Sequence, residues 1–218
     1  MRLLITCGPS SEPIDQVRRI TNFSTGKSGI FLSNYFTQQG HAVTCLASVN
    51  RTCHEGIKTS QVTEYATTHD LGKILKDLSQ GQEFDCVLHL AALSDYTISK
   101  ITDSSGNPLS DSKISSNHPS LHLTLKPAPK LISQMRAFFP KSKIIGWKYE
   151  LEGEREEAVL KAFAQIQQNK TDACVLNGRV IQDQFIFCES TGEQKKLPHL
   201  QELATHIEKW LEKHVPKN

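Results

Sequence analysis

Short apolar runs alternate with segments of helical periodicity along most of the chain. Strands are predicted at residues 2–7, 42–48, 85–92, 142–150 and 173–177. Helices are predicted at residues 26–39, 69–79, 129–138, 153–169 and 198–213, and the fourth opens with glutamates that suit a helix N-terminus. This alternation predicts an α/β fold, with a Rossmann-like, doubly wound and mainly parallel sheet that carries helices on both faces.

Two segments interrupt the alternation after the carboxyl end of a strand. Residues 8–25 place about 18 residues between a strand and its helix, where such connections usually have about 2 to 6. The second segment begins at Ser94, and we expect an irregular arm or hairpin insertion at about residues 97–128, in which LHLTLK pairs away from the main sheet. A further hairpin is expected near QFIFCE and GEQKKLP. Because doubly wound sheets bind ligands beyond the carboxyl ends of their strands, we expect the site in the first two segments.

Composition narrows the class of partner. The 25 basic and 23 acidic residues give a net charge of +2, which predicts no attraction to nucleic acid or to a membrane surface. No apolar run approaches the roughly 20 residues that span a bilayer, and the chain starts in a strand-like run. We therefore expect a single cytoplasmic domain over residues 1–218 with a small-molecule partner.

The cysteines and histidines favour no metal site. The six cysteines contain no C-x-x-C pair, four of them lie in apolar runs, and buried thiols are their expected role. The nine histidines show no zinc-like spacing with one another or with cysteine. We predict no metal site built by the protein.

The glycine pattern argues against a dinucleotide cofactor. The G-x-G-x-x-G turn is absent, because Pro9 and Ser10 follow Gly8, and the second strand ends without an acidic residue for a ribose. Residues 24–29, STGKSG, lead into a predicted helix, where hydroxyls, a lysine and free backbone N–H groups would stabilise an anion. An ordinary helix N-cap explains the same residues equally well.

Residues 5–29, ITCGPSSEPIDQVRRITNFSTGKSG, resemble the signature of phosphopantothenate-cysteine ligases, approximately ITSGGT-x-EPID-x-VR-x-ITN-x-S-[ST]-G-x-x-G. Further similar blocks are AALSDY at 91–96, KI at 113–114, GWKYE at 146–150 and CVLN at 174–177. The resemblance covers nearly the whole chain, at the length of the free-standing bacterial ligase rather than the bifunctional protein with a flavin decarboxylase domain. Pro9 replaces the second glycine of the G-G-T turn, and Gly178 and Arg179 replace the usual Asp-Leu. Ser115 and Ser116 stand where many members have lysines, and Trp147 replaces Phe.

The resemblance implies a ligase of coenzyme A biosynthesis. Such an enzyme joins 4'-phosphopantothenate to L-cysteine through an acyl-nucleotide and gives 4'-phospho-N-pantothenoylcysteine. CTP or ATP would be the co-substrate with Mg²⁺ bound to it, and CTP is favoured because the short chain resembles bacterial members. A homodimer is also implied.

The resemblance also implies a set of site residues. Both steps build negative charge, so donors and cations should matter more than proton transfer. The implied catalytic residues are Asn22, Lys113 and Arg18. The implied nucleotide-binding residues are Gly8, Ser10, Ala92, Asp95, Lys113 and Trp147. The implied contacts to the substrate phosphate and acyl group are Asn22, Ser24, Gly26 and Ala92.

Other roles and functions stay open at this point. Asn22 and Asp95 suit turns or caps, Lys113 suits a solvated loop, and Trp147 suits the core. A noncatalytic or regulatory nucleotide-binding protein on the same fold is one alternative. An NADPH-dependent reductase of Rossmann type is the other, although the missing glycine turn disfavours it.

Overall fold

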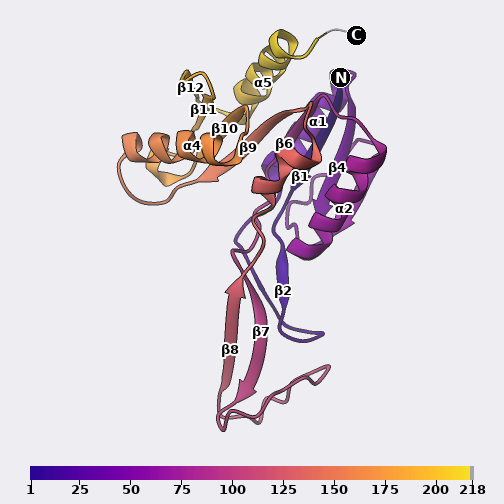
Figure 1. The fold of residues 1–218 in the computed structure, drawn as a ribbon, viewed down its shortest axis with the longest axis vertical. Helices are drawn as coiled ribbons and strands as arrows, with labels where there is room; N and C mark the ends of the chain where they lie inside the picture. Colours follow the sequence, from indigo (N-terminus) through magenta and orange to yellow (C-terminus); the bar gives the residue numbers. More distant parts are fainter. Residues whose placement is uncertain (217–218) are drawn as a thin grey trace.

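The computed structural model describes residues 1–216, and these form an eight-stranded central sheet (Figure 1). Its strands are β1 (Arg2–Cys7), β4 (Ala42–Ser48), β5 (Gln61–Tyr65), β6 (Cys86–His89), β9 (Lys143–Tyr149), β10 (Ala173–Asn177), β11 (Phe185–Glu189) and β12 (Gln194–Leu197). Their order is β12-β11-β10-β9-β6-β1-β4-β5. The strands from β10 to β5 are parallel, and β11 runs antiparallel to both of its neighbours.

Helices cover both faces of this sheet. They are α1 (Lys27–Gln38), α2 (Thr68–Gly81), α3 (Met135–Phe138), α4 (Arg155–Asn169) and α5 (Leu200–His214). The apolar sides of α1 and α5 share one buried cluster with β1, β6 and β11, whereas α2, α3 and α4 pack on the opposite face. The prediction of a doubly wound, mainly parallel α/β sheet is therefore confirmed. Within residues 1–216 no helix is long and apolar enough to cross a membrane.

The differences from the predicted elements have physical causes. Strand β5 was not predicted, because it is an edge strand in which only Tyr65 is buried and no apolar alternation marks it. The helix expected at 129–138 is a 3-10 turn, η1 (Leu131–Gln134), followed by the four residues of α3. A second 3-10 turn, η2 (Arg179–Ile181), follows β10. The hairpin expected before the last helix is confirmed as β11 and β12.

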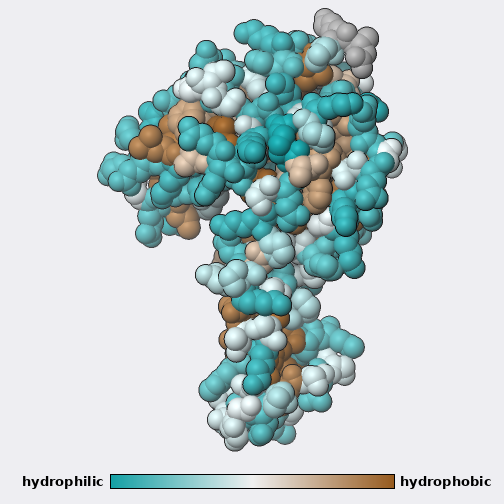
Figure 2. Space-filling view, viewed as in Figure 1, coloured by the Kyte–Doolittle hydropathy of each residue, from teal (hydrophilic) through white to brown (hydrophobic). Residues whose placement is uncertain are grey.

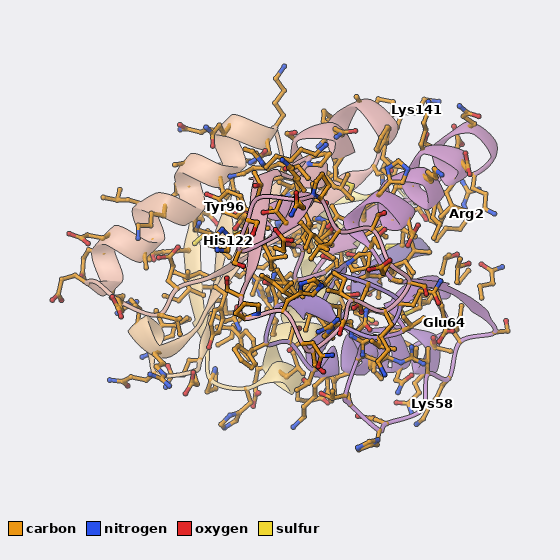
Figure 3. The ribbon with its side chains drawn as sticks, turned by 90° about the horizontal axis from the view of Figure 1, so that it is seen from below. Arg2, Lys58, Glu64, Tyr96, His122 and Lys141 are labelled. Atoms are coloured by element: carbon orange, nitrogen blue, oxygen red, sulfur yellow. The ribbon has the colours of Figure 1, made fainter. Side chains whose placement is uncertain are left out.

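The segment after β6 forms an arm, which we define as residues 96–127. Strands β7 (Tyr96–Asp103) and β8 (Leu121–Pro127) pair antiparallel in a sheet of their own, so the prediction of a hairpin insertion is confirmed. The arm extends away from the body, and its surface carries apolar patches (Figures 1 and 2). In the view from below, the arm residues Tyr96 and His122 lie apart from Arg2 and Lys141 at the rim of the body (Figure 3).

The long connection after β1 is also a hairpin. Strands β2 (Ser11–Pro13) and β3 (Arg19–Thr21) pair antiparallel, and residues 14–18 form the turn between them. This explains why so many residues separate β1 from α1.

The cysteines are free thiols, as expected. Five are buried and Cys53 is half-buried. The sulfur atoms of Cys7 and Cys45 lie 3.9 Å apart in a small apolar cluster under α1.

Candidate functional site

The sheet reverses its order of connection at β1, between β6 on one side and β4 on the other. The two loops that leave this point, residues 8–10 and 90–94, are called here the switch-point loops. They are joined by backbone hydrogen bonds from Ser10 N to Ala92 O (3.2 Å) and from Ala92 N to Gly8 O (3.0 Å). Ligands of doubly wound folds bind in the crevice at this position.

Two glycines allow the close approach of backbone at this point. Gly8 and Gly26 have φ angles of 87° and 80°, in the left-handed region. A Cβ on Gly8 would lie 2.7 Å from Ser48 Cβ, and one on Gly26 would lie 3.4 Å from Gly8 Cα. Glycine at position 8 therefore lets the end of β1 lie directly against the end of β4, and the left-handed backbone favours glycine at both positions.

A buried tyrosine fixes the end of β1. The hydroxyl of Tyr65 donates to the carbonyl oxygens of Cys7 (3.0 Å) and Gly8 (2.9 Å). Burial raises the pKa of Tyr65 far above its usual value, so the hydroxyl keeps the proton that it donates. Pro9 is buried beside it, and its carbonyl oxygen accepts from the Ser48 hydroxyl.

Ser10, one of the implied nucleotide contacts, is fully buried. Its hydroxyl oxygen accepts from the backbone N–H of Ser94 (2.9 Å) and from the hydroxyl of Thr68 (3.0 Å). The side chain thus ties the two switch-point loops to the start of α2. In this conformation Ser10 is not exposed to a ligand, so its effect on the crevice is to fix the shape of the loops.

Asn22 lies at the edge of these loops with its side chain exposed. Its Nδ2 donates to the carbonyl oxygens of Ala92 (3.2 Å) and Leu93 (2.9 Å), which fixes the orientation of the carboxamide. A pocket of about 220 Å³ lies beside it. The residues that line this pocket are Glu12, Ile20, Asn22, Ser94, Asp95, Tyr96, Ile98 and Leu125. Asn22 and Asp95, both predicted from the sequence, are therefore brought together.

Glu12 is a residue of this pocket to which the sequence analysis assigned no role. It is only 7% exposed, and its Oε2 accepts from the Thr97 hydroxyl (2.8 Å). Its Oε1 is buried without a partner among the described residues. Glu12 is the first residue of the sequence EPID, which matches the family signature, and this match could have marked it as a candidate site residue.

Arg18 and Lys113 line a different pocket, of about 340 Å³, together with Val17, Ile114, Ser115 and Ser116. The guanidinium of Arg18 donates to the carboxylate of Asp15 and to the carbonyl oxygen of Ile114 (2.7 Å). This guanidinium, with backbone N–H groups, holds the pKa of Asp15 well below its usual range. Within one chain, the implied catalytic residues thus divide between two pockets.

The start of α1 carries the implied phosphate contacts. Gly26 is the N-cap and makes no side-chain capping bond, while Lys27 N lies 3.2 Å from Thr25 Oγ1 and Ser24 is half-buried. Arg51, which the sequence analysis did not single out, lies against Gly26 and pairs with Glu64 at 2.9 Å. Arg51 follows β4, and no local motif marks it.

Trp147 lies in β9, the neighbour of β6 in the sheet, and Gly178 follows β10. Trp147 of β9 is half-buried and packs against the cluster shared by α1 and α5. Gly178 has a φ of 121°, and a Cβ there would lie 2.1 Å from Glu150 O. The departure from the family pattern at residue 178 is thus a position that only glycine fits in this chain.

These features define a class: a doubly wound α/β protein with a ligand crevice at its switch point. Within that class the chain belongs to the family described as DNA/pantothenate metabolism flavoprotein C-terminal domain, whose model matches residues 1–213. The family resemblance found in the sequence is thereby confirmed.

Individual relatives support the same placement. The bifunctional coenzyme A biosynthesis protein CoaBC of Thermococcus kodakarensis is 30% identical over 176 residues, which are 81% of this chain and 41% of the relative. The chain therefore spans less than half the length of this relative. A crystal structure titled DNA/pantothenate metabolism flavoprotein from Streptococcus pneumoniae superposes with a TM-score of 0.86 and 26% identity, over 98% of this chain and 99% of that one. A Cab2 mutant in complex with phosphopantothenate-cysteine shares the fold, with a TM-score of 0.71 and 18% identity, over 98% and 88% of the two chains.

Proposed function

We propose that the chain is a phosphopantothenate-cysteine ligase of coenzyme A biosynthesis. The observation that carries the proposal is the junction of the switch-point loops, where Asn22 is fixed against Ala92 and Leu93 beside Asp95. This junction is formed by the two sequence blocks that most resemble the ligases. Family membership over residues 1–213 supports the same reaction.

The first step activates the carboxylate of 4'-phosphopantothenate. A carboxylate oxygen attacks the α-phosphorus of the nucleotide, an acyl-nucleotide forms, and pyrophosphate leaves with the electron pair of the broken bond. Negative charge grows on the phosphoryl oxygens, so a cation at this position lowers the barrier. We assign this role to Lys113, with Arg18 beside it as a planar donor to an anionic group.

The second step forms the amide. The cysteine amine attacks the acyl carbon and loses a proton, and the nucleoside monophosphate leaves with the electron pair of the broken bond. We assign Asn22 to hold the acyl-nucleotide during this attack, because its carboxamide is oriented by two carbonyl oxygens and needs little rearrangement. Ala92 lies against the same group, and Ser24 and Gly26 face the substrate phosphate at the start of α1.

The nucleotide occupies the crevice at Gly8, and Asp95 and Trp147 contact it with their side chains. Ser10 stabilises the loop through its buried hydrogen bonds. CTP is the favoured co-substrate and ATP the competitor. Mg²⁺ enters bound to the triphosphate, whose oxygens are the hard ligands that this ion prefers. It neutralises phosphate charge when bound.

We propose further that a second copy of the chain covers the arm. Tyr96, Leu123 and Leu125 are 54%, 36% and 45% exposed, and the surface of the arm carries apolar patches (Figure 2). A two-stranded hairpin is marginally stable by itself, and contact with a partner surface would bury these side chains. Sedimentation at several protein concentrations tests this, and a monomer at all of them would contradict it.

The activity is tested by pyrophosphate release from 4'-phosphopantothenate with CTP or ATP, first without and then with L-cysteine. The proposal expects acyl-nucleotide without cysteine and 4'-phospho-N-pantothenoylcysteine with it. Absence of product with both nucleotides would favour a noncatalytic nucleotide-binding protein. Oxidation of NADPH by the chain would favour the reductase instead.

Variants separate the two steps. Lys113→Gln should block acyl-nucleotide formation, and Asn22→Asp should allow it but stop transfer to cysteine. Lys100→Gln and Asn117→Asp are matched controls, since both residues are exposed on the arm and line neither pocket. Wild-type turnover in both site variants would show that the assignment is wrong.

A further inference from the structure

Asp15 lies at the centre of a junction between two segments far apart in the sequence. Its side chain has no exposed surface. Its Oδ1 accepts from the backbone N–H groups of Val17 (2.9 Å) and Arg18 (2.7 Å). Its Oδ2 accepts from Arg18 Nε (3.0 Å) and from the backbone N–H of Ile114 (3.2 Å). One carboxylate thus holds the 14–18 turn and the segment next to Lys113 together.

The junction fixes the backbone on both sides of Lys113. Arg18 Nη2 donates to the carbonyl oxygen of Ile114 (2.7 Å), and Gln16 N donates to that of Ser112 (3.0 Å). The side chain of Ile114 is only 2% exposed. Lys113 itself is exposed. The exposed Lys113 therefore lies between two residues, Ser112 and Ile114, whose backbone is fixed by hydrogen bonds.

We propose that Asp15 is a positioning residue that sets the location of the Lys113 ammonium. A lysine side chain has a flexible stem, so the place of its charge depends on where its backbone is anchored. Misplacing a catalytic group by a small distance loses much of its effect on the rate. Asp15 reaches no open surface and acts through Arg18 and Ile114. The inference rests on the proposed function of Lys113.

The test is Asp15→Asn in the full chain, with two measurements. The first is the rate at which trypsin cuts the Lys113–Ile114 bond in the folded protein, followed by mass spectrometry. Loss of hydrogen bonds to a charged group typically shifts a local opening equilibrium by roughly 10- to 100-fold, and cleavage should accelerate by that factor. The second compares the half-reactions: acyl-nucleotide formation should slow about tenfold or more, whereas transfer of a supplied acyl-nucleotide to cysteine keeps its wild-type rate.

Asp103→Asn is the matched control. Asp103 lies on the arm and, like Asp15, accepts several hydrogen bonds, from Ser105 N and Asn107 N (both 2.9 Å) and from Asn107 Nδ2 (3.0 Å). The hydrogen bonds of its side chain thus come from residues 105 and 107 and not from the Lys113 segment. Its replacement should leave both the cleavage rate at Lys113 and the ratio of the half-reactions unchanged.

Two outcomes overturn the inference: cleavage at the wild-type rate in folded Asp15→Asn, or equal slowing of both half-reactions. If circular dichroism finds that this variant does not fold, the cleavage rate is measured in Arg18→Lys instead, since this variant keeps the charge but loses the donor to Ile114 O. Its half-reactions are not compared, because Arg18 is itself assigned to the first step. A wild-type protein that releases no pyrophosphate contradicts the proposed function instead. In that case the cleavage rates still decide whether Asp15 holds the segment.

Discussion

The switch-point loops and the arm are both parts of the candidate site, but they are held in opposite ways. The switch-point loops are braced by buried groups, including Tyr65 of β5, Gly26 at the N-cap of α1 and the Ser10 hydroxyl, which accepts from Ser94 N. The arm pairs mainly with itself, and nearly all of β8 is exposed. Packing within the chain thus determines the shape of the switch-point loops. The position of the arm depends instead on hydrogen bonds at a few points, above all those of Asp15.

The largest effect is expected where α1 meets β1. A Cβ on Gly29 would lie 2.1 Å from Cys7 Cβ, so Gly29→Ala must push the helix off the strand that leads into the switch-point loops. We expect the free energy of unfolding in urea to fall by about 3 kcal/mol or more. Gly81→Ala, at a position with nothing within 4 Å, is the control and should change it little. Equal effects of the two substitutions would mean that this packing is loose.

A pH effect of similar size is expected from His89, which braces the same region. Its Nδ1 lies 2.9 Å from Thr6 Oγ1, and this hydroxyl accepts from Ala91 N at 3.2 Å. Burial lowers the pKa of His89 from 6.5 to about 4, so the unfolded chain takes up the proton first as the pH falls. The free energy of unfolding should therefore drop by up to about 3 kcal/mol between pH 6.5 and 4, and this contribution levels off below pH 4.

The measurement is urea unfolding across this pH range in wild type and in His89→Gln. The difference between the two curves isolates the contribution of His89. His199→Gln, at an exposed position, should keep the wild-type slope. A His89→Gln curve parallel to that of wild type would contradict the prediction.

A smaller loss is expected from Tyr65→Phe. The substitution leaves the carbonyl oxygens of Cys7 and Gly8 buried without the hydroxyl that donates to them. We expect a decrease of about 1 to 3 kcal/mol in the free energy of unfolding, because unpaired buried polar groups are costly. Tyr149→Phe, on a side chain that is 59% exposed, is the control. An equal decrease in the free energy of unfolding for Tyr149→Phe would show that the buried hydroxyl of Tyr65 contributes no more to stability than an exposed one.

The smallest effect on folding is expected in the arm. Leu123→Thr alters an exposed residue of β8 and should change the free energy of unfolding by less than about 0.5 kcal/mol at concentrations where the protein is monomeric. At high concentration the same variant should weaken self-association, as measured by sedimentation. A loss of about 2 kcal/mol or more in the monomer would mean that the arm is packed within the chain, which would contradict the comparison.

Particular elements and residues show which features of the fold and of the candidate site could be predicted from the sequence. The five core strands, the doubly wound sheet and the arm follow from local apolar patterns and breaks in them. Strand β5 does not, because an edge strand needs no apolar face. Asn22 and Asp95 were predicted as site residues from the family motif, and they line one pocket. The buried, hydrogen-bonded state of Ser10 had no local signal, since its partners Thr68 and Ser94 are distant in the chain.

By itself, the sequence determined the fold class and the family and predicted the segments of the candidate site, because these depend on periodicity and on contiguous motifs. Only the tertiary structure decided that Lys113 and Asn22 line separate pockets and that Asp15 reaches the Lys113 segment. The hydrogen bond between Asp15 and Ile114 joins residues 99 positions apart in the chain. Such contacts exist because the order of strands in the sheet sets which loops meet, and hydrogen bonds form only where donors and acceptors have been brought within reach.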